Sequence, residues 1–402
     1  MQNYNYTAKD DYGKVVRGTM MADDEIDLAN KISKLGYFLI RSKVIAGNHV
    51  VAGRKLARMS YSEVLNFTLH LATLLDAGIA MVAALRELAQ DEDRQNVQKI
   101  IDDIRYRVES GTSLKDALSI HPTSFPKVYT AIVGAGEVTG KLAACLNDLA
   151  VLLDWQMELR AKVKEAATYP IILFTVLVGV VTLLVVKLIP VFEPIFKEMK
   201  VELPLPTQIV LELSHLVRSK GLVALGVIVL FVIGYKLYNS TTKGRYRIDS
   251  LKLKLPLFGQ LLRKVSLSRF CHTFALGLRS GVNVLTALDF AAEVVGNSRL
   301  QRSVVQARDS VNVGEKLATS FKMSGEFPPL VIRMIGVGEQ SGSLIQTLEK
   351  VNQFYDREVP QTIKIIFTLI EPLMIVLMAA IVGFIAVAVF MPMFRMADVI
   401  GG

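Results

Sequence analysis

Three long apolar stretches stand out in the pattern of hydrophobic and polar residues along the chain. Residues 171–189 are apolar except for two threonines and Lys187, and such a helix is about 28 Å long, close to the thickness of a bilayer core. Residues 221–237 form a shorter, marginal stretch, and residues 365–394 form a longer one that contains Glu371 and Pro372. The pattern predicts three transmembrane helices, at 169–189, 221–238 and 365–394.

The pattern also repeats along the chain. Residues 67–85 match residues 270–288 at an offset of 203, with Gly78 and Gly281 at equivalent positions. Further on, the sequence Gly-Glu-x-x-Gly-x-Leu occurs at 136–142 and again at 338–344, an offset of 202 that Pro170 and Pro372 keep. A register held over such a distance predicts a duplicated domain.

Each copy has the spacing of packed amphipathic helices. In the first copy, Ser60 and Glu63 form a capping box that opens a helix, and we expect Gly78 and Gly281 to end helices in the left-handed conformation. Similar signals predict further helices at about 79–91, at about 94–110, after 113, at 126–139, and from 140 into the membrane. We therefore expect about six helices per copy, in bundles at 59–168 and 239–364.

A small separate unit precedes the repeats. Alternating residues from Tyr4 to Ala8 and at 15–19 predict two strands around a turn at 11–13, followed by a helix from about 24 to Gly36 and a third strand at 37–40. We assign 1–42 to this unit and 43–58 to a linker. The expected fold class is a mainly α membrane protein with two repeated cytoplasmic helical bundles, three transmembrane helices and a small N-terminal α+β unit.

Flanking charges predict the orientation of the chain. Basic residues precede the first apolar stretch and crowd residues 239–270, whereas residues 190–220 contain four basic and four acidic residues. Because Lys- and Arg-rich flanks stay in the cytoplasm, we expect the N-terminus and both bundles inside, and the loop 190–220 and the tail 395–402 in the periplasm. Two equivalent bundles on one side need an even number of crossings between them, which supports the marginal second helix.

Composition narrows the possible functions. The formal net charge is +9, but aromatic and basic residues are not interleaved, so we expect no nucleic-acid binding. Two isolated cysteines, Cys145 and Cys271, indicate a reducing compartment, and the N-terminus shows no signal peptide. The histidines lack metal-ligand spacing and no catalytic triad pattern occurs. The sequence predicts no cofactor, no metal site and no enzyme activity.

The Gly-Glu turns are the first candidate sites. The turn at 136–142 resembles a phosphate-binding loop, but Leu142 stands where a hydroxyl residue is needed and the turn joins two helices. A glycine hinge at Gly140, and at Gly342 in the second copy, is therefore favoured. Glu137 and Glu339 could cap the helix that follows, dock a partner or hold a cation weakly, and of these capping is favoured.

A second candidate lies where the third apolar stretch begins. Glu371 stands beside Pro372, whereas the first stretch has Tyr169 beside Pro170. An ionisable residue at membrane depth is a candidate proton-relay group. Because 22 residues follow Pro372 before the stretch ends, Glu371 can also lie at the cytoplasmic interface as a cap or a hydrogen-bond partner, and this structural role is favoured.

Taken in this order, the motifs resemble the inner-membrane platform protein family of type II secretion systems and type IV pili. The resemblance covers almost the whole chain, from the Tyr-x-Ala-x-Asp-x-x-Gly-Lys sequence at 6–14 to the proline pairs at 169–170 and 371–372. It implies a non-enzymatic hub on a cytoplasmic hexameric assembly ATPase, which passes the motion of that ATPase to pilins or pseudopilins beside other inner-membrane assembly proteins. We expect at least a homodimer. Whether the filament is a pilus or a pseudopilus stays open.

Two other functions compete with this adaptor. An ion-coupled stator or channel would use Glu371 as its titrating group. A secondary transporter fits poorly, because transporter repeats usually lie within the membrane and these lie mostly in the cytoplasm.

Overall fold

The computed structural model describes residues 2–9, 15–22, 25–34, 37–45, 58–188, 190–191, 194 and 204–400. The chain divides into two compact units, Met1–Ala57 and Arg58–Gly402.

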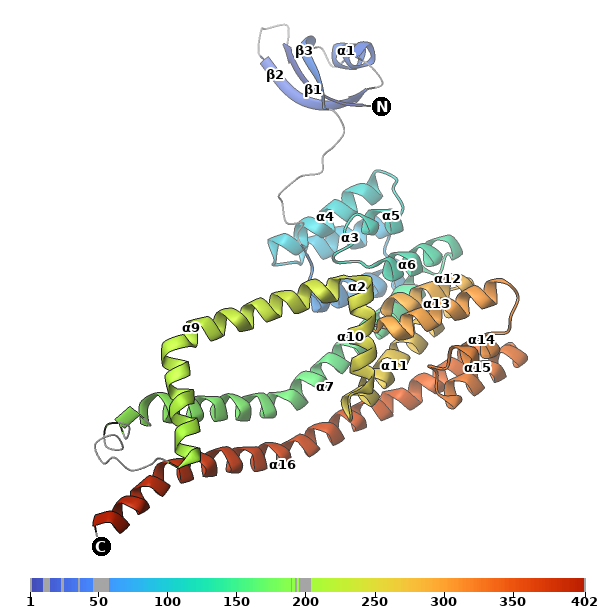
Figure 1. Cartoon of the computed structure of the whole chain (residues 1–402). Coiled ribbons are helices and arrows are strands. Elements are labelled where there is room, and N and C mark those ends of the chain that lie inside the picture. The colour runs from blue at the N-terminus through green and yellow to red at the C-terminus, as the bar shows by residue number, and fades with distance from the viewer. Residues whose placement is uncertain are drawn as a thin grey trace. The chain divides into compact units, whose positions relative to one another are not determined.

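The first unit is a three-stranded antiparallel sheet with one helix (Figure 1). Its elements are β1 (Gln2–Lys9), β2 (Val15–Ala22), α1 (Glu25–Lys34) and β3 (Phe38–Ile45), and the strand order is β2-β1-β3. Ala8, Leu28 and Ile32 are fully buried at its centre. Because β3 reaches Ile45, the predicted linker cannot begin at residue 43. The predicted turn at 11–13, Gly36 and residues 46–57 lie outside the described residues.

The first copy of the repeat folds into six helices. They are α2 (Tyr61–Asp76), α3 (Met81–Gln90), α4 (Gln95–Glu109), α5 (Leu114–Ser119), α6 (Lys127–Thr139) and α7 (Leu142–Leu183). The capping box predicted for α2 is present, since the Glu63 N–H donates to Ser60 Oγ at 3.3 Å and the Ser60 N–H donates to the Glu63 carboxylate at 2.5 Å. Gly78 follows α2 with a φ of 81°, as the sequence predicts.

The second copy repeats this order. Its helices are α11 (Phe258–Arg279), α12 (Val284–Val294), α13 (Ser298–Asn312), α14 (Leu317–Ser324), α15 (Pro329–Ser341) and α16 (Leu344–Ile400). Gly281 follows α11 with a φ of 82°. The aromatic rings of Phe270, Phe321 and Phe327 contact one another in the core, with centroids 4.5–5.3 Å apart.

The last helix of the first copy is built into the core of the second. Leu159 of α7 belongs to the buried apolar cluster of the second copy. One turn earlier, Trp155 stacks on the His272 ring of α11, with centroids 4.2 Å apart. The two copies therefore share packing as well as sequence.

The segment between the copies contains a π-helical turn, η1 (Leu184–Leu188), and the helices α9 (Leu205–Ser240) and α10 (Thr242–Lys254). Residues 205–220 of the predicted periplasmic loop 190–220 are therefore helical, so they do not form a loop. Prolines that flank and enter the first turn favour a helix start there, and Ser214 Oγ donates to the Val185 carbonyl of η1 at 2.7 Å. Likewise, α16 continues to Ile400, so the predicted tail 395–402 begins inside a helix.

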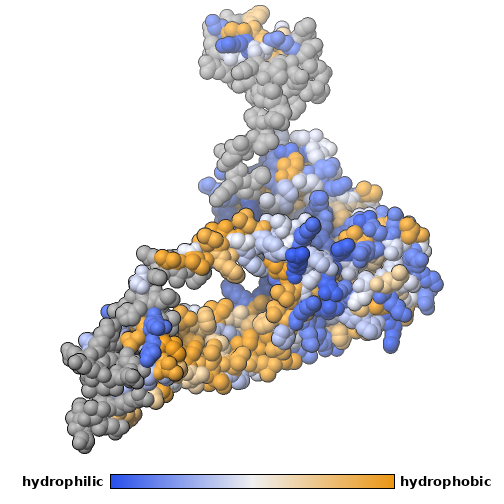
Figure 2. Space-filling model, in the orientation of Figure 1, coloured by the Kyte–Doolittle hydropathy of each residue, from blue (hydrophilic) through white to orange (hydrophobic). Residues whose placement is uncertain are grey.

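Two helices in the described part of the chain are long and apolar enough to cross a membrane. They are the stretches Leu142–Lys187 and Leu344–Pro392, which contain all but the last two residues of the first and third predicted spans. The second predicted span lies within α9, which is not one of the two. Figure 2 shows the apolar surface along these long helices and the polar surface over the bundles.

Candidate partner-interface motifs

Each Gly-Glu turn joins the fifth helix of its copy to the sixth. Gly140 ends α6 with a φ of 69°, and Gly342 ends α15 with a φ of 68°. Glycine is favoured at both positions because other residues adopt this left-handed conformation with strain. Each turn therefore joins two helices through a left-handed glycine, whereas a phosphate-binding loop follows a strand.

The two glutamates of these turns cap helices, but not the helices that we predicted. The N–H groups of Leu114 and Lys115, at the start of α5, donate to the Glu137 carboxylate at 2.6 and 2.9 Å. In the second copy, the N–H groups of Leu317 and Ala318, at the start of α14, donate to the Glu339 carboxylate at 2.7 and 3.2 Å. Capping is therefore the correct interpretation, but the capped helix precedes the turn. The reason is that side chains in the last turn of a helix lean toward its N-terminus, away from the helix that follows.

The first glycine of each turn has a role that sequence reasoning missed. A Cβ on Gly136 would lie 3.0 Å from a backbone atom of Leu142, and one on Gly338 would lie 2.7 Å from a backbone atom of Leu344. These glycines let the fifth and sixth helices pack closely. The signal was available, because glycine occurs at this position in both copies.

Glu371 lines an open groove between α7 and α16. Tyr169 and Pro170 of α7 and Phe367 of α16 line the same groove, together with Lys162, Glu165 and Lys364. Glu371 is exposed and makes no hydrogen bond or ion pair with another described residue. Pro170 and Pro372 both lie inside continuous helices. The structure thus brings Tyr169 and Pro170 to the same groove as Glu371, the residue that the repeat placed opposite Tyr169.

An ion-pair cluster joins the two copies, and no sequence pattern pointed to it. Arg279, at the end of α11, donates to Asp148 of α7 at 3.0 Å and also contacts Glu349 of α16. Burial alone would lower the pKa of Arg279, but the two carboxylates raise it. The partners are far apart in sequence, so only the packed structure reveals them.

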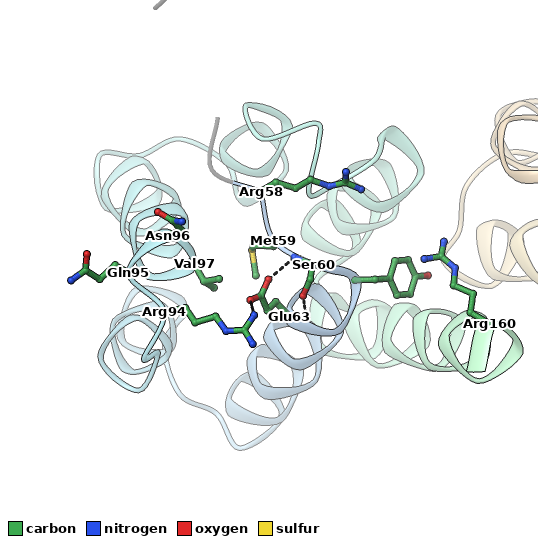
Figure 3. A pocket seen from close by; sticks show the side chains of 10 residues that line it. Arg58, Met59, Ser60, Glu63, Arg94, Gln95, Asn96, Val97 and Arg160 are labelled. Carbon is green, nitrogen blue, oxygen red and sulfur yellow. Dashed lines mark hydrogen bonds and ion pairs between the residues drawn. The ribbon is translucent and has the colours of Figure 1, made fainter. Parts of the chain in front are cut away.

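A pocket opens where α2 begins (Figure 3). Glu63 lies between the Ser60 N–H and the Arg94 guanidinium, and both contact its carboxylate. Burial would raise the pKa of Glu63, but the hydrogen bonds from Ser60 and Arg94 hold it below its usual value. Arg58 and Arg160 line the same pocket away from this pair.

No group of three or more histidine, cysteine or acidic side chains that could hold a metal ion occurs among the described residues. Cys271 is fully buried, and burial raises the pKa of its thiol. It packs in the core beside phenylalanines, which suits a structural thiol better than a reactive one.

Comparison with known proteins identifies the repeated domain. Residues 67–190 and 270–392 each match the family described as type II secretion system (T2SS), protein F, and residues 1–43 match the N-terminal domain of that protein. The two matches fall on the two copies of the repeat, so the duplication predicted from the sequence is confirmed.

Relatives of nearly equal length carry two kinds of name. The type IV pilus assembly protein PilC of Thermus thermophilus is 36% identical over 400 residues, which cover 98% of each chain. That of Myxococcus xanthus is 34% identical over 98% of this chain and 95% of its own. The type II secretion system protein F of Pseudomonas aeruginosa is 31% identical over 100% of both chains. These names describe assembly and secretion components and not enzymes, as the sequence predicts. The chain therefore belongs to the type II secretion system protein F family, which includes the PilC proteins of type IV pili.

Proposed function

We propose that the chain is a non-enzymatic inner-membrane platform of a type IV pilus or type II secretion machine. In this role it couples a cytoplasmic assembly ATPase to the extraction of pilins or pseudopilins and to filament assembly. One observation carries the proposal: in each copy, the last helix of the bundle continues without a break into an apolar segment.

This continuity suits a mechanical role. At 1.5 Å per residue, the 42 residues of α7 extend about 63 Å and the 57 residues of α16 extend about 86 Å. A bilayer core is about 30 Å thick, so about half of α7 and about two thirds of α16 extend beyond it and are available to the bundles. A displacement of either bundle would move the attached apolar segment directly.

We propose a topology with three crossings, with both bundles in the cytoplasm. Three features support α9 as the second crossing. Its apolar residues, among them Val227, Leu230 and Phe231, are exposed. The basic helix α10 follows it, and two bundles on one side need an even number of crossings between them. Reporter fusions after residues 195 and 241 test this. Alkaline phosphatase should be active at the first position and inactive at the second.

The partner is tested by co-purification of the full chain in detergent with each candidate assembly ATPase of the same genome. Glu137 and Glu339 are poor probes, because they cap helices inside the bundle. Exposed apolar residues on the bundles are better, such as Val138 at 89%, Val313 at 79% and Met323 at 77% exposure. We expect one ATPase to be captured, and capture to fall when one of these residues is changed to glutamate but not in the control Thr139→Glu. Failure of every candidate with correctly inserted protein, or ATP turnover by the pure chain, would contradict the proposal.

A second candidate function rests on the unpaired carboxylate of Glu371. An ion-coupled stator or channel would need such a group near the membrane. The equivalent residue of the first copy is Tyr169, which makes a symmetric relay impossible. Glu371→Gln separates the two functions: filament assembly persists in the platform and stops in the stator.

A further inference from the structure

The two copies differ in charge at one equivalent place. In the second copy, basic residues near the start of α11 meet two glutamates. Arg263 donates to Glu326 at 3.1 Å, and Lys264 donates to Glu358 at 2.7 Å. Arg299 also donates to Glu326, at 2.6 Å, and Glu326 is only 6% exposed. Each cation of this cluster therefore has a carboxylate within the chain.

The first copy has neutral residues where the second has these glutamates. The sequence Thr-Ser-Phe-Pro at 123–126 aligns with Gly-Glu-Phe-Pro at 325–328, so Ser124 replaces Glu326. At the same offset Gln156 replaces Glu358. The Tyr61 hydroxyl donates to Gln156 at 2.7 Å, where Lys264 and Glu358 form an ion pair in the second copy. Both carboxylates are thus absent from the first copy.

Arginines nevertheless surround this neutral place. Arg58, Tyr61, Thr123, Ser124, Gln156 and Arg160 line one pocket, which we call the arginine pocket. It shares Arg58, Tyr61 and Arg160 with the pocket of Figure 3, where Arg58 and Arg160 are seen apart from the Glu63–Arg94 pair. The guanidinium of Arg160 lies over the Tyr61 ring, 4.4 Å from its centroid.

A third arginine, from the second copy, lies within electrostatic reach of Arg160. Arg269 of α11 is half-buried, and both its burial and the charge of Arg160 lower its pKa. None of Arg58, Arg160 and Arg269 forms an ion pair with a described residue. Glu63, which lines the adjoining pocket of Figure 3, is already bound by Ser60 and Arg94. Arg58 and Arg160 are exposed and Arg269 is half-buried, so guanidinium groups without a carboxylate partner face this place and attract an anion from outside the chain.

We propose that the arginine pocket binds a glutamate or aspartate side chain on an acidic segment of a partner protein. In the second copy, the glutamates at the equivalent place pair with Arg263, Lys264 and Arg299. In the first copy the arginines come from other positions, and both carboxylates are missing. Arginine presents paired donors that match a carboxylate. Val64, Val128 and Leu149 line the inner part of the pocket and can receive an apolar neighbour of the acidic residue.

Binding of a fluorescein-labelled (Glu-Ala)4 peptide to the full chain in detergent, measured by fluorescence anisotropy at low salt, tests the proposal. The variant Ser124→Glu/Gln156→Glu places in the pocket the two glutamates that the second copy has at the equivalent positions. We expect peptide binding at least tenfold weaker than in the wild type, and a higher Tm because the arginines gain partners. Arg58→Gln/Arg160→Gln should also weaken binding at least tenfold.

Matched controls separate the pocket from the net charge of the chain. Arg86→Gln/Lys254→Gln removes the same two charges elsewhere, and a (Gln-Ala)4 peptide removes the charge of the probe. We expect binding to the control variant to stay within about twofold of the wild type, and the neutral peptide not to bind. Equal weakening in the control variant would overturn the proposal. So would an unchanged affinity and Tm in Ser124→Glu/Gln156→Glu, or binding of pyrophosphate in place of the peptide.

Discussion

The glutamates of the Gly-Glu turns offer a direct test of their structural role. Glu137→Ala removes both acceptors from the first N–H groups of α5, and Glu339→Ala does the same for α14. The two helices differ in what remains. Ser113 still caps α5 by accepting from the Asp116 N–H at 3.0 Å, whereas Lys316 at the N-cap of α14 makes no side-chain cap. Loss of the glutamate should therefore destabilise α14 more than α5.

The expected magnitude follows from the bonds that are lost. A hydrogen bond to a charged group contributes about 1.5–3 kcal/mol, and a favourable helix-dipole interaction adds about 0.3–1 kcal/mol. Both glutamates are half-buried, and water replaces part of this interaction in the variants. We expect a local loss of about 1.5 kcal/mol for Glu137→Ala and about 2–3 kcal/mol for Glu339→Ala.

Hydrogen exchange measured by mass spectrometry on the full chain reads this loss locally. Amides of 114–119 should exchange about tenfold faster in Glu137→Ala, and amides of 317–324 about 30- to 140-fold faster in Glu339→Ala, because each 1.4 kcal/mol is a factor of ten. The neighbouring exposed residues provide the controls Val138→Ala and Gln340→Ala. Unchanged exchange in the glutamate variants, together with loss of a bound partner, would refute the capping role and favour docking.

Three further changes have definite expected results. Gly338→Ala should lower the free energy of unfolding by about 3 kcal/mol in thermal or denaturant melts, and Gly136→Ala by less, because the added Cβ meets the backbone at 2.7 and 3.0 Å respectively. Burial would raise the pKa of Asp249, but hydrogen bonds from Ser298 and the charge of Lys252 hold it below its usual value. Its stabilisation is thus fully present above about pH 4 and is lost as the pH falls through the lowered pKa, so Asp249→Asn should melt earlier than the wild type at pH 7, and the difference in Tm should narrow as the pH falls below 4. Arg279→Gln should shift the Tm only slightly, since exposed ion pairs contribute about 0–1 kcal/mol.

Local signals in the sequence predicted the helix boundaries of the bundles well. Pro126 marks the start of α6 and Gly140 its end, because each suits the backbone of a helix terminus and little else. The repeat strengthened such signals by showing them twice.

Features that depend on packing between distant segments could not be predicted from the sequence. The target of Glu137 could not be read from the sequence, because the start of α5 lies more than twenty residues before it and reaches it only in the folded bundle. The start of α9 was missed because charged residues interrupt its apolar pattern, and its contacts with η1 and α16 stabilise it. The contact of Arg279 with Asp148 likewise joins residues of different copies. Pairs of this kind carry no local pattern.

The shared core bears on how a platform could transmit motion. Leu159 of α7 is buried in the second copy, and Trp155 stacks on His272 there, so the last helix of the first bundle is fixed to the second bundle before it reaches its apolar segment. Close-packed interiors resist sliding, because each small displacement loses many contacts. Force applied to either bundle would therefore reach both long helices, α7 and α16. Two bundles that share a core would move together, whereas two independent docking modules would not, and joint motion suits the mechanical role that we propose.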